Sequence, residues 1–212
     1  MTAAAALEHG LRELALDLSP GQREQLLDYV VLLEKWNRTY NLTAVREPLA
    51  MVSHHLLDSL ALLPHLPLQE TSDARVADVG SGAGLPGIPL AIANPQLQVT
   101  LLDSNGKKTR FLRHVQRTLD LANVEVVEAR LEDFEPGLVY TAIVCRAFGA
   151  LGEFIAQALR LVAPGGRLVA MKGKLDRKEV GAIPAAAVIK DIRRLNVPGL
   201  AEERHLIVAA VL

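Results

Sequence analysis

The sequence is poor in cysteine and in aromatic residues, and it has no excess of charge of either sign. A single cysteine, Cys145, cannot form an internal disulfide, so nothing ties the chain to an oxidising compartment. Aromatic residues make up 4% of the 212 residues, so the core must be built mainly from Ala, Leu and Val. The 23 Lys and Arg and the 24 Asp and Glu give a net charge of −1, which excludes a polycation but allows a local basic patch.

Signals for membranes and for metals are missing as well. No apolar stretch approaches the roughly 20 residues that span a bilayer, and the N-terminus has no basic segment before its short apolar run, which Glu8 interrupts. The six histidines are scattered without an H-x-x-x-H pair, and one cysteine supplies no zinc cluster. We therefore expect a cytoplasmic protein with no metal and no membrane partner.

Charge and pattern divide the chain near residue 74. Residues 1–74 hold 10 acids and 5 bases, whereas residues 75–212 hold 14 acids and 18 bases. The first part shows helical periodicity and no strand-like alternation, and the second part shows short apolar strands alternating with helices. We predict a helical N-terminal extension over residues 1–74 and a second domain over residues 75–212, with Pro67–Ala74 as the linker.

Prolines mark the helices of the N-terminal part. Ser19 can cap, and Pro20 can begin, a helix that reaches about Asn37. Pro48 begins a second helix, which Pro64 ends. Apolar residues recur in this helix at steps of three or four and predict one buried face: Leu49, Val52, Leu56, Leu60 and Leu63.

The second part predicts a mostly parallel sheet. Five buried strands are expected at Arg75–Gly80, Gln98–Asp103, Val124–Val127, Val139–Ala147 and Gly166–Lys172, with helices between them at Pro86–Ala93, Gly106–Leu119 and Leu151–Val162. Alternating strands and helices indicate an α/β fold with a parallel sheet covered on both faces. At the end, Val188–Leu195 and His205–Leu212, joined by a turn at Pro198-Gly199, predict an antiparallel hairpin.

A glycine-rich segment follows the first predicted strand and leads into a helix. It is Asp78–Pro89, with the sequence D-V-G-S-G-A-G-L-P-G-I-P. Gly80, Gly82 and Gly84 let the chain turn sharply and bring backbone N–H groups close to a ligand. Because ligands of open α/β sheets bind at the carboxyl ends of the strands, we predict a ligand site at this loop. A glycine turn that binds nothing is the alternative.

The spacing of the loop favours one ligand class. A Walker loop needs a Lys after its glycines, and none follows here. A dinucleotide loop has the spacing G-x-G-x-x-G, whereas this one has G-x-G-x-G with Asp78 two residues ahead. Asp103, at the end of the second strand, can bond ribose hydroxyls and suits NAD and S-adenosylmethionine equally. The cationic, phosphate-free methionine end of S-adenosylmethionine tolerates Asp78, so we favour that cofactor.

Several segments together resemble one bacterial enzyme family. They are Asp78–Pro89, Leu101-Leu-Asp-Ser104, Arg146-Ala-Phe148, Pro164-Gly-Gly166, Met171-Lys-Gly173, Trp36-Asn-Arg-Thr-Tyr-Asn-Leu-Thr43 and His55-Leu-Leu-Asp-Ser59. Over roughly residues 26–212 the chain thus resembles the 16S ribosomal RNA guanine-N7 methyltransferases of the small subunit, the RsmG or GidB family. The strings G-L-P-G-I-P and W-N-x-x-Y-N-L-T are the specific ones, because D-x-G-x-G-x-G alone indicates only a class I methyltransferase. Gly149 departs from many members, and the first 18 residues match nothing in the family.

The resemblance implies a class I, Rossmann-like S-adenosylmethionine-dependent methyltransferase. The implied reaction is methyl transfer to N7 of guanine 527 in the 530 loop of 16S rRNA, within the small subunit or an assembly intermediate. Carried over by position, the residues that line the cofactor site are Gly80, Leu85, Leu131, Glu132 and Arg146, and Asp103 binds the ribose. With the loop residues Asp78, Gly82 and Gly84, these complete the expected cofactor site. We expect the protein to act as a monomer.

The expected reaction does not require a side chain that acts as a base or a nucleophile. Guanine N7 has an in-plane lone pair and is nucleophilic when neutral, so catalysis can rest on positioning and on exclusion of water, without a general base. Methylation of a ring carbon would need a cysteine nucleophile, but Cys145 lies inside an apolar strand and is expected to be a core residue. Methylation of an exocyclic amine usually goes with an N-P-P-Y-like string, where this chain has Cys145-Arg-Ala-Phe148.

Arg146 is the strongest candidate for a catalytic side chain. An arginine at the carboxyl end of an apolar strand is costly to bury without an anionic partner. The cofactor carboxylate, Glu132 and an RNA phosphate are candidate partners, and an ion pair with a structural acid is the alternative.

Two basic clusters are candidates for binding RNA. Residues 104–119 contain five bases and no acid, and Lys172–Lys178 follows the fifth predicted strand. Such clusters at the ligand end of a sheet can bind phosphates, although a solvated surface is the alternative. We predict RNA contacts for Lys107, Arg113 and Lys172.

Two further side chains are candidates for contact with the RNA. His55 lies one helical turn before Asp58, so it is expected either to contact RNA or to bond that acid. Phe148 can stack on the guanine or pack in the core.

Other functions also fit the sequence. The same cofactor can serve another RNA or a protein acceptor. An NAD-binding oxidoreductase fits Asp103 but not the glycine spacing, and the chain has no evident second substrate domain. A non-catalytic module that recognises the small subunit during assembly is a further alternative. Binding of NAD but not of S-adenosylmethionine in equilibrium dialysis would contradict the favoured function.

Overall fold

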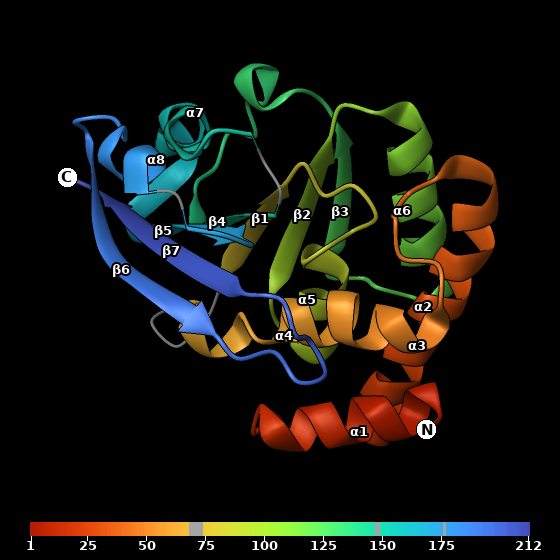
Figure 1. Cartoon of the computed structure of the whole chain (residues 1–212). Coiled ribbons are helices and arrows are strands. Elements are labelled where there is room, and N and C mark those ends of the chain that lie inside the picture. Colours follow the sequence, from red (N-terminus) through yellow and green to blue (C-terminus); the bar gives the residue numbers. More distant parts are fainter. Residues whose placement is uncertain (68–73, 147–148, 176) are drawn as a thin grey trace.

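The structure, a computed structural model, describes residues 1–67, 74–146, 149–175 and 177–212. Phe148 and most of the predicted linker at Pro67–Ala74 therefore lie outside the described residues. A seven-stranded sheet forms the centre of the molecule, with helices on both of its faces (Figure 1). Within the described residues, none of the helices combines the length and the apolar composition that a membrane span requires.

Described residues 1–67 contain helices and no strand, as predicted. The elements are α1 (Ala3–Glu13), α2 (Pro20–Tyr40), α3 (Pro48–Met51), a π-helical turn (Val52–Leu57), α4 (Asp58–Leu60) and a 3-10 turn (Leu63–His65). Ser19 caps α2, because its hydroxyl accepts the N–H of Gln22 at 3.3 Å while the Gln22 side chain accepts the N–H of Ser19 at 2.9 Å. Helix α2 runs beyond the predicted Asn37 and ends where Asn41 adopts a left-handed conformation, with φ of 49°.

The helix that begins at Pro48 differs from its prediction in its end and in one apolar position. It ends at Leu60, and Pro64 lies within the 3-10 turn that follows rather than at the end of the helix. Val52, Leu56 and Leu60 are buried, but Leu49 is 42% exposed, so its expected place on the buried face is wrong. The π-helical turn at Val52–Leu57 holds more residues per turn than an α-helix, and it shifts the phase of the residues on either side of it.

The sheet has the strand order β3-β2-β1-β4-β5-β7-β6. Its strands are β1 (Arg75–Val79), β2 (Gln98–Asp103), β3 (Val124–Glu128), β4 (Tyr140–Arg146), β5 (Val162–Lys172), β6 (Ala187–Leu195) and β7 (Arg204–Val211). The first five are parallel, and β7 pairs antiparallel with both β5 and β6. The predicted parallel sheet and terminal hairpin are confirmed, with the last strand inside the sheet and β6 at its edge.

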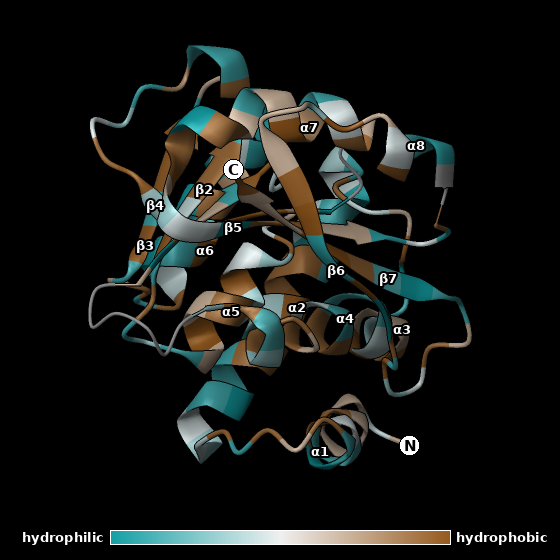
Figure 2. Ribbon diagram, turned by 90° about the vertical axis from the view of Figure 1, so that its left-hand side faces the viewer, coloured by the Kyte–Doolittle hydropathy of each residue, from teal (hydrophilic) through white to brown (hydrophobic). Residues whose placement is uncertain are grey.

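Helices cover the two faces of the sheet in distinct groups. They are α5 (Gly87–Ala93), α6 (Gly106–Thr118), α7 (Leu151–Ala158) and α8 (Arg177–Gly181), with 3-10 turns at Leu131–Asp133 and Leu159–Leu161. Alternate strand residues point to opposite faces, so Val76 packs with the N-terminal helices, α5 and α6, whereas Ala77 packs with α7. Hydrophobic colour is concentrated in the strands and in the helices next to them (Figure 2).

The N-terminal helices share one core with the sheet. Leu26, Leu33 and Tyr29 of α2 belong to the same buried cluster as Val76 of β1 and Ile88 of α5. The buried hydroxyl of Tyr29 donates to the carbonyl of Ala83 in the glycine loop at 2.7 Å. The division of the chain into domains at residue 74 stays a prediction, and this packing places α2 directly against the loop.

The carboxyl ends of β1, β2, β4 and β5 lie along one edge of the sheet. Strand order reverses between β1 and β4, which is where open α/β sheets bind ligands. Because β7 is antiparallel to β5, its first residues also lie at this edge, and His205 pairs with Lys172. Arg204 therefore enters the region although it belongs to the amino end of its strand.

Candidate functional site

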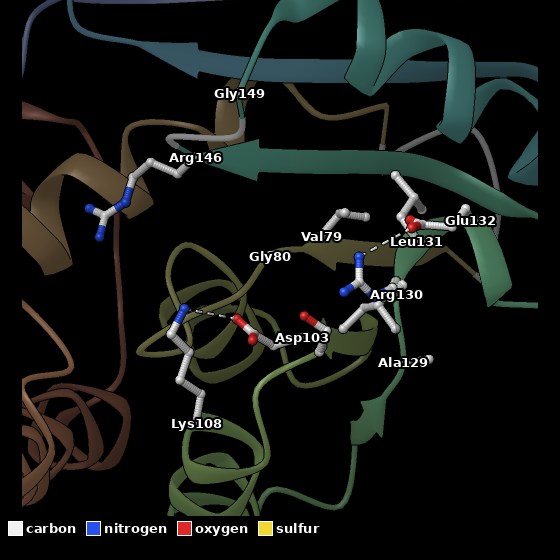
Figure 3. A pocket seen from close by; sticks show the side chains of 12 residues that line it. Val79, Gly80, Asp103, Lys108, Ala129, Arg130, Leu131, Glu132, Arg146 and Gly149 are labelled. Atoms are coloured by element: carbon white, nitrogen blue, oxygen red, sulfur yellow. Dashed lines mark hydrogen bonds and ion pairs between the residues drawn. The ribbon is translucent and has the colours of Figure 1, made fainter.

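A cavity of about 370 Å³ lies at the carboxyl ends of β1 and β2 (Figure 3). We refer to it as the first cavity. Its volume falls within the roughly 300–1,000 Å³ of small-molecule sites. Five residues that were predicted to hold the cofactor line it, at or just after the carboxyl ends of β1 to β4: Gly80, Asp103, Leu131, Glu132 and Arg146. The other predicted cofactor residues do not line this cavity: Asp78, Gly82, Gly84 and Leu85.

The backbone N–H groups of the glycine loop are bonded within the protein. Gly80 donates to the carbonyl of Leu102 at 2.8 Å, and Gly84 donates to the carbonyl of Ser81 at 2.7 Å. Gly82 donates to Asp103 Oδ2 at 2.9 Å. The expectation that these N–H groups face a ligand is wrong, because the tight turn that the glycines form directs them inward. The loop therefore suits a phosphate-free ligand better than the diphosphate of a dinucleotide, which needs free N–H donors.

Asp103 ends β2 at the wall of the first cavity. Its Oδ1 accepts the N–H of Asn105 at 2.9 Å, and its Oδ2 lies 3.4 Å from the ammonium of Lys108 (Figure 3). A carboxylate offers about four acceptor positions, and with the bond from Gly82 three are filled here. Asp103 thus keeps acceptor capacity for a hydroxyl group in the cavity.

Asp78 lies beneath the loop and is fully buried. Its Oδ2 accepts the N–H of Gly87 at 2.9 Å, and Gly87 has no room for a side chain because a Cβ would lie 2.8 Å from that same oxygen. Within the described residues, Oδ1 of Asp78 has no hydrogen-bond partner. Burial raises the pKa of the carboxyl to about 7, although the Gly87 bond and Arg146 oppose the rise.

Arg146 lines the first cavity, but its guanidinium points away from Glu132 (Figure 3). Nη1 donates to Asp58 Oδ2 at 3.3 Å and to the carbonyl of His54 at 3.1 Å. Glu132 pairs with Arg130 instead, at 3.6 Å. The expectation of Glu132 as a partner is therefore wrong, and the alternative of an internal ion pair is the one observed. The acid is supplied by the N-terminal part, which the helix from Pro48 brings against the end of β4.

A second cavity of about 410 Å³ lies on the other side of Arg146. It is lined by Arg146 of β4, by Lys172 of β5, by Arg204 of β7 and, from the N-terminal part, by His55 and Asp58. The Asp58 side chain is 1% exposed and accepts Arg204 Nε at 3.2 Å in addition to Arg146. Burial raises the pKa of the Asp58 carboxyl against the opposing effect of the two guanidinium groups.

His55 is buried and bonds Thr43 rather than Asp58. Its Nε2 lies 2.9 Å from Thr43 Oγ1, so the expected bond between His55 and Asp58 is wrong. The acid is already bonded by two arginines. The side chain of Asn37 accepts the N–H of Thr43 at 2.9 Å and donates to the carbonyl of Val45, so the W-N-x-x-Y-N-L-T segment holds the loop that positions His55. Burial lowers the pKa of His55 to about 4, which leaves the imidazole neutral at pH 7.

The three predicted RNA-binding bases occupy different surroundings. Lys172 lines the second cavity, where its ammonium lies 3.0 Å from Glu179 and donates to the carbonyl of Gly149 at 2.9 Å. Arg113, on α6, lies 3.6 Å from Glu128. Lys107, at the start of α6, is exposed and forms no ion pair with the described residues. The structure thus brings only Lys172 and His55 together with Arg146.

Sequence reasoning missed two parts of this region. It did not select Arg204, and it considered Asp58 only as a partner of His55. The available signals are an acid in a mostly apolar helix and an arginine at the start of a predicted strand. Neither signal indicates which residue the charged side chain contacts. Cys145 is buried as predicted, and burial raises the pKa of its thiol. Among the described residues, no three metal-ligating side chains come together.

Comparison with known proteins gives matches over nearly the whole chain. Residues 22–207 match the model of a family described as GidB, rRNA small subunit methyltransferase G. The Ribosomal RNA small subunit methyltransferase G of Alkalilimnicola ehrlichii is 49% identical, with 95% of this chain and 90% of the relative covered. The protein of the same name from Chromobacterium violaceum is 50% identical, with 96% and 95% covered.

Solved structures share the fold at low sequence identity. An N-methyltransferase, NodS from Bradyrhizobium japonicum in complex with S-adenosyl-L-homocysteine, gives a TM-score of 0.57 at 16% identity, covering 84% of this chain and 96% of that one. TrmN from Thermus thermophilus also gives 0.57, at 20% identity, covering 76% and 53%. These likenesses confirm the predicted fold, that of the class I methyltransferases.

Proposed function

The chain belongs to the rRNA small subunit methyltransferase G family, and from that membership we propose that it methylates N7 of guanine 527 in the 530 loop of 16S rRNA. It is an S-adenosylmethionine-dependent rRNA methyltransferase. The match at 49–50% identity over almost the full length of both chains carries this conclusion. The alternative of an NAD-binding oxidoreductase is set aside, and the inward-bonded glycine loop supports the same choice.

The first cavity fits S-adenosylmethionine, which supplies the sulfonium methyl group when bound. Asp103 has acceptor capacity left for the ribose hydroxyls, and Gly80, Leu131 and Glu132 complete the wall around it. Gly82, Gly84 and Leu85 do not line the cavity. They are proposed to support the cofactor indirectly, because they form the turn that positions Gly80 and Asp103. Asp78 supports that turn from below through Gly87.

Arg146 is proposed as the residue that acts on the reacting groups. It lines both cavities, so this residue lies between the expected donor and the expected acceptor. Neutral guanine N7 needs no base. His55, with a pKa of about 4, is a weak one, and both carboxylate oxygens of Asp58 already accept hydrogen bonds from arginines. The chain therefore contributes orientation and exclusion of water.

The RNA is proposed to contact His55 and Lys172 at the second cavity and Lys107 and Arg113 on α6. Arg113 faces one acid at the protein surface, and such an exposed pair is weak enough for a phosphate to compete. Lys172 also faces one acid, Glu179, but this pair is only partly exposed. We further propose that the protein acts as a monomer, in the cytoplasm, on the small subunit or an assembly intermediate.

The test is a methyl transfer assay with mapping of the product. Small subunits from cells that lack this modification are incubated with the protein and methyl-labelled S-adenosylmethionine, and the labelled base is located by chain cleavage specific for N7-methylguanosine. Label at guanine 527 is the expected result. Label at another nucleotide, or in protein, contradicts the proposed target while leaving the methyltransferase activity in place.

A further inference from the structure

The second cavity has polar walls that the cofactor site does not explain. Its lining includes three cations, Arg146, Lys172 and Arg204, and one anion, Asp58. His55 adds no charge at neutral pH, because burial lowers its pKa to about 4. Glu179 neutralises Lys172 from outside the lining, which leaves the two guanidinium groups and one carboxylate with a net positive charge. A cavity with this balance suits an anionic ligand.

The two arginines are fixed, and each keeps donors to spare. Asp58 Oδ2 accepts Arg146 Nη1 at 3.3 Å, and Asp58 Oδ1 accepts Arg204 Nε at 3.2 Å. Arg204 Nη1 is occupied by the carbonyl of Glu203 at 2.9 Å. Within the described residues, the Nη2 groups of both arginines have no hydrogen-bond partner. Free N–H groups on a guanidinium held at its other end are well placed for phosphate oxygens.

The position of the second cavity indicates which kind of anion binds there. Arg146 forms a wall of both cavities, so a ligand in the second one lies next to the methyl donor in the first. Histidine and methionine side chains add apolar and stacking surface beside the cations, as a nucleotide requires.

We propose that the second cavity receives the acceptor nucleotide of the rRNA, with Arg204 donating to its phosphate and Asp58 holding Arg204 and Arg146 in position. This inference rests on the proposed function and names the substrate subsite. Arg204 is a binding residue, and Asp58 is a positioning residue that acts through the two guanidinium groups. Its burial and its two bonds leave it no part in proton transfer.

The test measures binding to unmodified small subunits without the methyl donor, so it does not depend on the reaction or its target base. Arg204→Gln is expected to weaken this binding about 10-fold, the effect of one charge-assisted hydrogen bond. The slope of log affinity against log salt is expected to fall by about 0.7, the value for one phosphate contact on a single strand. Affinity for S-adenosylmethionine, measured by equilibrium dialysis, is expected to stay within about twofold.

Two variants and one control complete the experiment. Arg204→Lys keeps the charge and is expected to restore the salt slope with only part of the affinity. Asp58→Asn keeps both arginines but frees them, so it is expected to weaken subunit binding while the salt slope stays as in the wild type. Arg75→Gln removes an equal charge at the amino end of β1 and is expected to change nothing.

Three results overturn the inference. The first is wild-type subunit affinity and salt slope in a folded Arg204→Gln protein, which assigns Arg204 a structural role only. The second is weaker S-adenosylmethionine binding in the same variant, which assigns the second cavity to the cofactor. The third is an equal effect of Arg75→Gln. Failure of the proposed function has a different signature, since the label then appears at another base while Arg204 still governs binding.

Discussion

The two cavities that meet at Arg146 are built in different ways. The first is formed by loops that directly follow β1, β2 and β3, and its central acid, Asp103, is bonded to residues 2, 5 and 21 positions away. The second depends on Asp58, whose partners Arg146 and Arg204 lie 88 and 146 positions away. The proposed cofactor subsite is thus assembled mainly from short segments of sequence, whereas the proposed acceptor subsite requires residues from distant parts of the chain.

One buried titratable residue lies at each cavity, and the pKa values of the two are shifted in opposite directions. The largest expected effect is therefore on how the stability of the protein depends on pH. Asp78, beneath the first cavity, has its pKa raised to about 7, so the folded state binds the extra proton and stability is lost as pH rises through 7. His55, at the second, has its pKa lowered to about 4, so stability is lost as pH falls from 6.5 through 4. These pKa shifts correspond to about 4 kcal/mol for Asp78 and about 3 kcal/mol for His55 over their windows.

Single substitutions are expected to separate the two effects. Relative to wild type, His55→Gln gains stability as pH falls from 7 to 4, and Asp78→Asn gains stability as pH rises from 4 to 8. Urea unfolding at a series of pH values measures both differences. Parallel curves for wild type and either variant contradict the assignment of that residue.

The next largest effect is expected at Asp103. Asp103→Ala removes the acceptor for the N–H groups of Gly82 and Asn105 and the proposed ribose contact. Affinity for S-adenosylmethionine is expected to fall about 100-fold, from the loss of one hydrogen bond to a charged group. Affinity for small subunits is expected to stay unchanged, and Asp17→Ala, at an exposed position, is the matched control. An equal loss of both affinities shows that the two cavities are not separable.

Arg146→Gln is expected to affect both cavities, whereas Asp103→Ala is expected to affect only the first. Because Arg146 lines both cavities, affinity for S-adenosylmethionine and affinity for small subunits are each expected to fall about 10-fold. Equilibrium dialysis and subunit binding measure the two losses in one preparation. A loss confined to one ligand assigns Arg146 to that cavity alone.

The smallest expected effect lies at the contact between α2 and the glycine loop. Tyr29→Phe removes the buried bond to the carbonyl of Ala83 and is expected to lower the free energy of unfolding by about 1 kcal/mol. S-adenosylmethionine affinity is expected to fall about twofold, and subunit affinity to stay the same. Tyr40→Phe is the control, since the Tyr40 hydroxyl forms no hydrogen bond with the described residues, although its ring packs on Trp36. Equal effects of both variants contradict a specific role for the Tyr29 hydroxyl.

The same contrast explains what could be predicted from the sequence. Strand positions, the glycine turn and Asp103 follow from local rules, because turn conformation, burial and strand ends depend on residues close in sequence. The burial of Leu49 was mispredicted because a π-helical turn leaves no clear trace in apolar spacing. The partners of Arg146 and His55 were mispredicted because each had several candidate groups, and only the packing of the Pro48 helix against β4 and β7 selects between them. Arg204 was missed because antiparallel pairing, rather than a motif, brings it to the site.

Arg146 lines both cavities with a single side chain, and this has a thermodynamic consequence. Its bonds to Asp58 and to the carbonyl of His54 fix Nη1 of the guanidinium. A ligand in one cavity that reorients the remaining N–H groups therefore changes the donors that a ligand in the other cavity contacts. By linkage, the factor by which bound cofactor alters affinity for RNA must equal the factor by which bound RNA alters affinity for cofactor. With the proposed roles of the two cavities, one side chain couples the two substrates reciprocally, and the order in which they bind does not change the free energy of the ternary complex.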